Sequence, residues 1–287
     1  MIRIFLLFLI GAISIFAVDF SSYETEEAKR KYKNNYFGME PHYPNYLLPF
    51  GITSKPYKSY ILSDEYKKYE AELQVSLKLK ITDNLVGFDE KYYFAYTHKA
   101  MWQVYAKSSP FRETNYNPEF FIDLPLNISY IESLKKIQLK ISHISNGQGD
   151  NRNIEYPEGI ENPGHRSRSM NFLELMACFE YKDLYTNIKF WTPYRHNQNL
   201  KDNDDIMDYY GYASAKVSYF YGKNMATLMG RINPATGKGA IETTYSYPLD
   251  MYDDYYVFIK GFSGYGETLI DYNNYISKIS IGISFSR

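Results

Sequence analysis

The sequence predicts an all-β protein, namely a twelve-stranded antiparallel transmembrane β-barrel with a polar lumen. Three observations lead to this prediction: apolar side chains with a two-residue period, a high tyrosine content, and charged residues on the second face of the same strands. Aromatic residues make up 18% of the 287 residues, and 32 of them are tyrosines. Tyrosine suits strands and water–lipid interfaces, because its apolar ring ends in a hydroxyl group that stays hydrated.

The alternation of apolar and polar side chains marks the strands in chain order. We count about eleven clear strands and a weaker one at 45–54, and bacterial single-chain barrels close with an even number of strands, which favours twelve. Clusters of turn-forming residues, such as 202–205 and 233–237, lie between them. The clearest apolar faces are Leu73 to Ile81, Phe94 to Val104, Ile137 to Ile141, Leu173 to Phe179, and Ile279 to Phe285.

The polar face of these strands favours a membrane barrel over a soluble β-sandwich or a lipocalin-like barrel. Lys78, Lys80 and Lys140 stand in mid-strand, opposite the apolar residues. A polar lumen inside an apolar outer surface explains such residues better than a dry core does. After the N-terminal segment no run approaches about 18 apolar residues, so no membrane-spanning helix is expected.

The N-terminus has the pattern of a secretory signal. Arg3 supplies a positive charge, and a weakly polar to apolar run follows at 4–16. We therefore expect a signal peptide at 1–17, a polar periplasmic arm at 18–44 and the barrel at 45–287.

The composition argues against three other kinds of site. The formal net charge of −1 gives no indication of nucleic acid binding. The single cysteine, Cys178, excludes an intrachain disulfide framework and a cysteine-based zinc site. The spacing of His42, His165 and His196 does not suggest a transition-metal site.

A histidine and a serine lie on the apolar face at the end of one predicted strand. Side chains at i and i+2 share a face, so His143 and Ser145 lie on the face of Leu139 and Ile141. A base and a nucleophile among apolar side chains do not suit a soluble enzyme, but they suit a lipid substrate. Polar groups that face lipid are costly, which indicates a function for this pair.

Asn171 completes a candidate triad. It shares parity with the apolar residues of the next strand, and antiparallel pairing of 134–146 with 168–181 brings it near His143. Ser145 becomes an effective nucleophile when His143 takes its proton, and the imidazole needs a third group to fix its tautomer and orientation. The side-chain oxygen of Asn171 can accept the other imidazole N–H. A neutral amide also costs less beside hydrocarbon than a carboxylate does.

Several blocks, in the same order along the chain, resemble the outer membrane phospholipase A family. They include HISNG at 143–147, SRSMN at 167–171 and the highly specific SSPFRETNYNP at 108–118. The resemblance covers about residues 45–287. It implies a twelve-stranded barrel of the bacterial outer membrane that hydrolyses acyl esters of phospholipids and lysophospholipids, with phospholipase A1 and A2 activity. The remaining blocks are YTHKAMWQ at 96–103, NDDI at 203–206, YGY at 210–212 and GYGETLIDYN at 264–273.

The resemblance also implies the roles of individual residues. It makes Ser145 the nucleophile, His143 the base and Asn171 the orienting residue, with the Gly147 N–H as oxyanion donor. The triad is implied to lie outside the barrel, near the outer leaflet, in a calcium-dependent homodimer. The implied calcium ligands are the Gln148 carbonyl and the Ser167 hydroxyl of one subunit, the Ser108 carbonyl of the other, and Asp205 at a further calcium position.

This chain departs from the family pattern at several positions. Gln148 replaces a usual arginine, and Met170 stands where an aromatic residue is common. The chain ends in Arg287 rather than in an aromatic residue. The loop at 150–166 is longer than usual and is interpreted as a solvated extracellular loop, with extra calcium or lipopolysaccharide-facing contacts as the alternative. It contains four acidic residues, Asp150, Glu155, Glu158 and Glu161.

His98 is the subject of a separate hypothesis. It shares parity with Trp102 and occupies the place of a polar glutamine in the family, so we expect it at the dimer interface at membrane depth. Its protonation at mildly acidic pH is then expected to disfavour the dimer. The alternative is a histidine that faces the lumen.

Two other functions are alternatives to a phospholipase. A catalytically silent outer-membrane barrel with a structural or pore role needs no outward-facing Ser145, His143 and Asn171, and twelve strands leave a narrow lumen. A soluble secreted esterase is disfavoured because the sequence has nothing like a nucleophile elbow.

Overall fold

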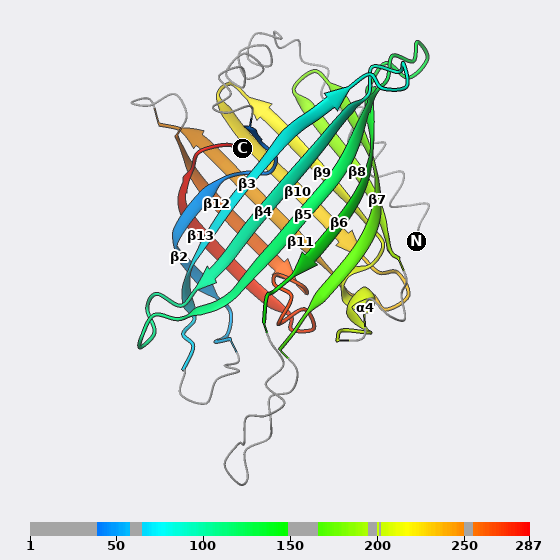
Figure 1. The fold of residues 1–287 in the computed structure, drawn as a ribbon. Coiled ribbons are helices and arrows are strands. Elements are labelled where there is room, and N and C mark those ends of the chain that lie inside the picture. The colour runs from blue at the N-terminus through cyan, green and yellow to red at the C-terminus, as the bar shows by residue number, and fades with distance from the viewer. Residues whose placement is uncertain (1–38, 58–64, 149–165, 195–199, 201, 250–254) are drawn as a thin grey trace.

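A computed structural model describes residues 39–57, 65–148, 166–194, 200, 202–249 and 255–287 (Figure 1). Within these residues, strands β2 to β13 form a closed antiparallel barrel of 12 strands. Each strand pairs with the next along the chain, and β13 pairs with β2 to close the barrel. The predicted fold class is confirmed.

The strands are long and tilted (Figure 1), and the β7–β8 and β9–β10 hairpins have two-residue turns at the same end of the barrel. A short additional strand, β1, pairs with β3 beyond the end of β2. The bounds are β1 (Met39–Pro41), β2 (Tyr46–Thr53), β3 (Tyr69–Asp83), β4 (Lys91–Trp102), β5 (Phe111–Pro125), β6 (Leu134–Ser145), β7 (Ser169–Tyr181), β8 (Leu184–Pro193), α4 (Ile206–Tyr210), β9 (Ala213–Tyr221), β10 (Asn224–Ile232), β11 (Gly239–Pro248), β12 (Tyr256–Gly264) and β13 (Ile276–Ser284).

The two faces of each strand differ as their parity predicts. In β6, Leu139 and Ile141 are 46% and 50% exposed on the outside, whereas Gln138 and Lys140 are each 3% exposed and face inward. An apolar outer surface lowers the cost of contact with lipid tails, and the polar groups inside find partners across the lumen. No helix among the described residues has the length and hydropathy needed to cross a membrane.

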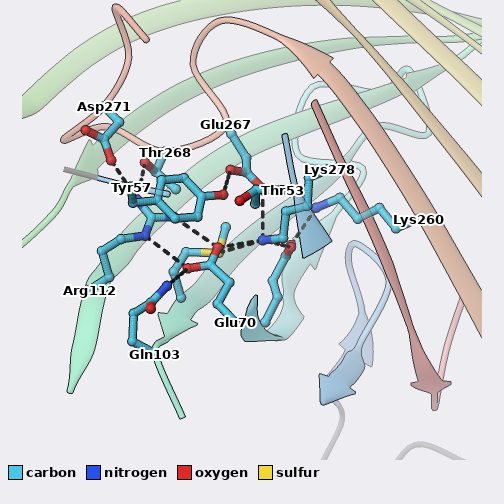
Figure 2. Close-up of polar contacts among 12 residues, drawn as sticks. Thr53, Tyr57, Glu70, Gln103, Arg112, Lys260, Glu267, Thr268, Asp271 and Lys278 are labelled. Carbon is cyan, nitrogen blue, oxygen red and sulfur yellow. Dashed lines mark hydrogen bonds and ion pairs between the residues drawn. The ribbon is translucent and has the colours of Figure 1, made fainter. Parts of the chain in front are cut away.

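A network of buried ion pairs crosses the lumen near the end of the barrel that carries α4 and the β12–β13 loop (Figure 2). The Arg112 guanidinium donates to both carboxylate oxygens of Glu70, at 3.0 and 3.1 Å, and to Asp271 at 2.8 Å. Lys278 binds Glu70 at 2.7 Å and Glu267 at 2.9 Å. The Arg112 and Glu70 side chains are fully buried, so each charge depends on its partner.

We expect Arg112→Ala to destabilise the barrel by about 3–5 kcal/mol, because Glu70 and Asp271 lose a buried counter-charge. The free energy of unfolding, measured by urea titration in lipid vesicles, checks this value. Lys80→Ala is the matched control, since Lys80 pairs with Asp83 in an exposed hairpin end and its loss is expected to cost at most about 1 kcal/mol. Equal effects of the two substitutions would contradict the structural role of the lumen network.

Residues just before the predicted start of the barrel at 45 already contact the lumen. His42 lies 2.9 Å from Glu119 and stacks on Phe121 at 5.0 Å, and the Tyr43 hydroxyl accepts a hydrogen bond from Lys140 at 2.8 Å. The end of the expected arm is therefore packed inside the barrel. The expected signal peptide and residues 18–38 lie outside the described residues.

An apolar cluster covers the barrel end near α4. It joins β7, the β8–β9 segment and the β12–β13 loop, and so holds two separate loops against β7 at the same end of the barrel as the C-terminal end of β6. Its buried members are Met170, Leu200, Ile206, Met207, Leu269 and Tyr272.

Candidate active site

His143 and Asn171 face each other across the β6–β7 ladder. They are direct partners in the antiparallel register, and His143 Nδ1 lies 2.8 Å from Asn171 Oδ1. Because the amide oxygen is an acceptor, this contact requires the imidazole proton on Nδ1 and leaves Nε2 as the basic nitrogen. Both side chains are half-buried among outward-facing apolar residues, as the strand parity predicts.

Ser145 lies two residues after His143 on the same outer face of β6 and is half-buried. In the described part of the chain, no hydrogen bond joins the Ser145 hydroxyl to His143. Hydrogen bonds between a nucleophile and its base are often long before substrate binds. The pairing of Ser145 with His143 as nucleophile and base is therefore argued from their shared face and from the basic Nε2 of His143.

Gly147 lies two residues after Ser145 and has a backbone conformation that favours glycine, with φ of +61°. A Cβ atom there would lie 2.6 Å from Cε2 of the Tyr116 ring. Tyr116 is the register partner of Ser145 in β5. The glycine therefore lets the chain turn closely over this ring, immediately beside the candidate nucleophile.

Asn146 connects the two segments that carry candidate calcium ligands. Its buried side chain donates to the Arg166 carbonyl at 2.7 Å and accepts from the N–H groups of Arg168 at 3.0 Å and Gln148 at 3.3 Å. Its own N–H donates to the Arg168 carbonyl at 3.0 Å. This buried amide holds Gln148 next to the segment that contains Ser167.

The other two candidate calcium ligands lie in separate loops. Ser108 is exposed between β4 and β5 with φ of +62°, and Asp205 is exposed at the start of α4. Hydroxyl, carbonyl and carboxylate oxygens fit a hard cation such as calcium. Among the described residues, no group of three or more His, Cys, Asp or Glu side chains is arranged to hold a metal ion.

His98 lies on the outer face of the barrel rather than in the lumen. It is the register partner of Tyr116, which is in turn the partner of Ser145, so the three residues form one row across β4, β5 and β6. The His98 and Tyr116 rings are 5.3 Å apart in an edge-on arrangement. His98 is thus placed about 10 Å, or two strand spacings, from Ser145.

The structure also shows two residues that the sequence did not single out. Glu113, buried in β5, accepts hydrogen bonds from the N–H groups of Leu269 and Ile270, both at 3.0 Å. Tyr272 donates a hydrogen bond to Asp205. Both contacts fall within the family-like blocks, which is the one signal that could have indicated them. The acidic residues at 150–161 lie outside the described residues.

Comparison with known proteins gives matches over most of the chain. The family model for phospholipase A1 matches residues 22–285. A putative phospholipase A1 of Neisseria meningitidis is 33% identical over an alignment of 267 residues. The alignment covers 87% of this chain but 65% of that protein, just under two thirds of its length. The phospholipase A1 of Escherichia coli is 30% identical over 256 residues, covering 87% of this chain and 82% of the relative.

Solved structures are similar over most of the barrel. Outer membrane phospholipase A of Escherichia coli matches with a TM-score of 0.75 and 30% identity, over 88% of this chain and 93% of that one. The Salmonella typhi outer membrane phospholipase, solved as a dimer with bound calcium, matches with a TM-score of 0.75 and 29% identity, over 88% and 94%. This chain therefore belongs to the phospholipase A1 family and is a β-barrel of the bacterial outer membrane.

Proposed function

We propose that this protein hydrolyses the acyl ester bonds of phospholipids and lysophospholipids, with both phospholipase A1 and A2 activity. The contact between His143 and Asn171 on the lipid-facing surface carries the proposal, because a structural barrel has no use for it there. Phospholipids with a different acyl chain at each position, followed by identification of the released fatty acids, test the positional claim. Release from one position alone would overturn the combined A1 and A2 activity.

The geometry supports a covalent mechanism. Ser145 Oγ attacks the ester carbonyl carbon while His143 Nε2 takes the hydroxyl proton, and the amide oxygen of Asn171 holds the Nδ1–H side of the ring. His143 then gives the proton to the leaving glycerol oxygen as the ester bond breaks. Water, activated by His143, hydrolyses the acyl-serine and releases the fatty acid. The Gly147 N–H is the proposed donor to the oxyanion.

Calcium and a second subunit belong to the same proposal. The Gln148 carbonyl, the Ser167 hydroxyl and the Ser108 carbonyl of the other subunit would hold the cation, with Asp205 at a further position. When bound, calcium supplies positive charge near the negative charge that develops in the transition state. The Salmonella typhi relative, solved as a dimer with bound calcium, supports this arrangement.

We expect a positive charge on His98 to weaken the dimer, because a protonated imidazole at an apolar subunit interface is poorly solvated. Tyr96 and Tyr116 are the titratable neighbours of the His98 ring. Crosslinked dimer yield with calcium, compared for wild type and His98→Gln, measures the effect. The glutamine variant is expected to remove the pH dependence, and identical profiles would contradict it.

A catalytically silent barrel with a structural or pore role is the alternative. The lumen network argues against an open pore, since buried ion pairs cross the barrel interior (Figure 2). Calcium-dependent fatty acid release by the purified dimer separates the two functions. An inactive, correctly folded dimer would favour the silent barrel.

A further inference from the structure

An exposed carboxylate and a buried tyrosine meet where two loops approach each other. Asp205, at the start of α4, accepts a hydrogen bond from the hydroxyl of Tyr272, which is 6% exposed in the β12–β13 loop. An aspartate that begins a helix usually accepts a hydrogen bond from the N–H groups of the first turn. Asp205 makes no such side-chain bond, so its carboxylate is directed to Tyr272 instead.

We propose that Tyr272 is a positioning residue that holds the Asp205 carboxylate in place for calcium. The inference rests on the proposed function, in which Asp205 is a calcium ligand. A tyrosine hydroxyl occupies one lone pair of one carboxylate oxygen and leaves the second oxygen available to a cation. Hydrogen bonds of this kind orient the groups that bind a metal and reduce the freedom lost on binding.

Tyr272 is suited to this role because the loop that carries it is anchored to the barrel. Glu113 accepts the N–H groups of Leu269 and Ile270, and Arg112 binds Asp271 at 2.8 Å (Figure 2). Buried charges thus fix the residues immediately before Tyr272, and the apolar cluster near α4 encloses its ring. The position of the Tyr272 hydroxyl is therefore fixed by the contacts that its loop makes with the wall of the barrel.

The Tyr272 ring also contacts the segment that carries Ser167, the candidate calcium ligand before β7. The Arg168 guanidinium lies over the Tyr272 ring, 5.8 Å from its centroid, and Arg168 follows Ser167 directly. The Tyr209 ring packs edge-on against it at 5.5 Å. Tyr272 therefore contacts the segments that carry Ser167 and Asp205, one on each side.

Calcium binding to the full-length protein in detergent micelles tests the proposal. Calorimetric titration with calcium alone, together with the calcium concentration at half-maximal dimer formation, is measured for wild type and Tyr272→Phe. The ring and its packing are kept, and only the hydroxyl is lost. We expect calcium affinity at the Asp205 position to fall about 10-fold. Tyr275→Phe is the matched control, because Tyr275 is an exposed tyrosine of the same loop that bonds to Ser263, and it is expected to leave calcium binding unchanged.

Asp205→Asn separates failure of this inference from failure of the proposed function. If Asp205→Asn binds calcium as wild type does, Asp205 is not a ligand. The calcium role of Asp205 in the proposed function and the positioning role of Tyr272 are then both overturned. If Asp205→Asn weakens binding but Tyr272→Phe resembles Tyr275→Phe, only the role of Tyr272 is overturned. The double variant is expected to bind no more weakly than Asp205→Asn alone, and this cycle cancels any general loss of stability. Fully additive effects would show that Tyr272 acts without Asp205 and would overturn the proposal.

Discussion

Replacement of Ser145 by alanine is expected to lower phospholipid hydrolysis by about 10⁴-fold or more. Without the hydroxyl no acyl-enzyme can form, and His143 and Asn171 have no nucleophile to activate. His143→Ala is expected to have a comparable effect, because removal of one member of such a unit costs nearly as much as removal of all. Fatty acid release from phospholipid micelles with calcium, per mole of folded barrel, is the measurement.

Ser142→Ala is the matched control for this experiment. Ser142 lies in the same strand, but it faces the lumen and bonds to Asn117 at 2.7 Å, so its loss is expected to leave the chemical step unchanged. Substantial activity in Ser145→Ala would overturn the triad and would require a different nucleophile.

Removal of calcium is expected to produce the next largest loss. A chelator should reduce hydrolysis by about 10²–10³-fold, the cost of losing one stabilising group at an oxyanion. The subunits are also expected to separate, since the proposed ligands Gln148 and Ser167 come from one subunit and Ser108 from the other. Activity and dimer yield are measured on the same samples with and without chelator.

Restoring the cation distinguishes a specific site from a general effect of ionic strength. Calcium is expected to recover both activity and dimer, whereas magnesium at the same concentration recovers little, because it demands octahedral geometry and gives up its waters reluctantly. Full activity in the chelator would contradict the calcium requirement.

Side-chain alternation was sufficient to predict the barrel and the two faces of its strands. A barrel wall has one apolar and one polar face, so parity alone places Leu139, Ile141 and His143 outside and Lys140 inside. The same parity places Asn171 on the face of His143, and antiparallel pairing of the two strands brings the residues opposite each other. Strand periodicity thus predicted that His143 and Asn171 lie close together, and the proposed chemistry depends on the contact between them.

Contacts of the loops with distant parts of the chain could not be predicted from side-chain alternation. Glu113 holds residues that follow it by 156 and 157 positions, and Tyr272 reaches Asp205 between two loops with no repeating pattern. Loop backbones follow turn geometry and packing against neighbours, neither of which leaves a periodic trace in the sequence. Both contacts became visible when the closed barrel brought the loops together at one end.

Covalent labelling of the nucleophile tests most directly whether an outward-facing serine performs the chemistry. The calcium-loaded wild-type protein in micelles is treated with a long-chain alkyl fluorophosphonate, and the modified residue is located by peptide mass spectrometry. One adduct on Ser145 is expected, and it is expected to be lost when His143 is replaced by alanine. An adduct on another residue, or equal labelling of Ser145 without His143, would contradict a nucleophile activated by this histidine.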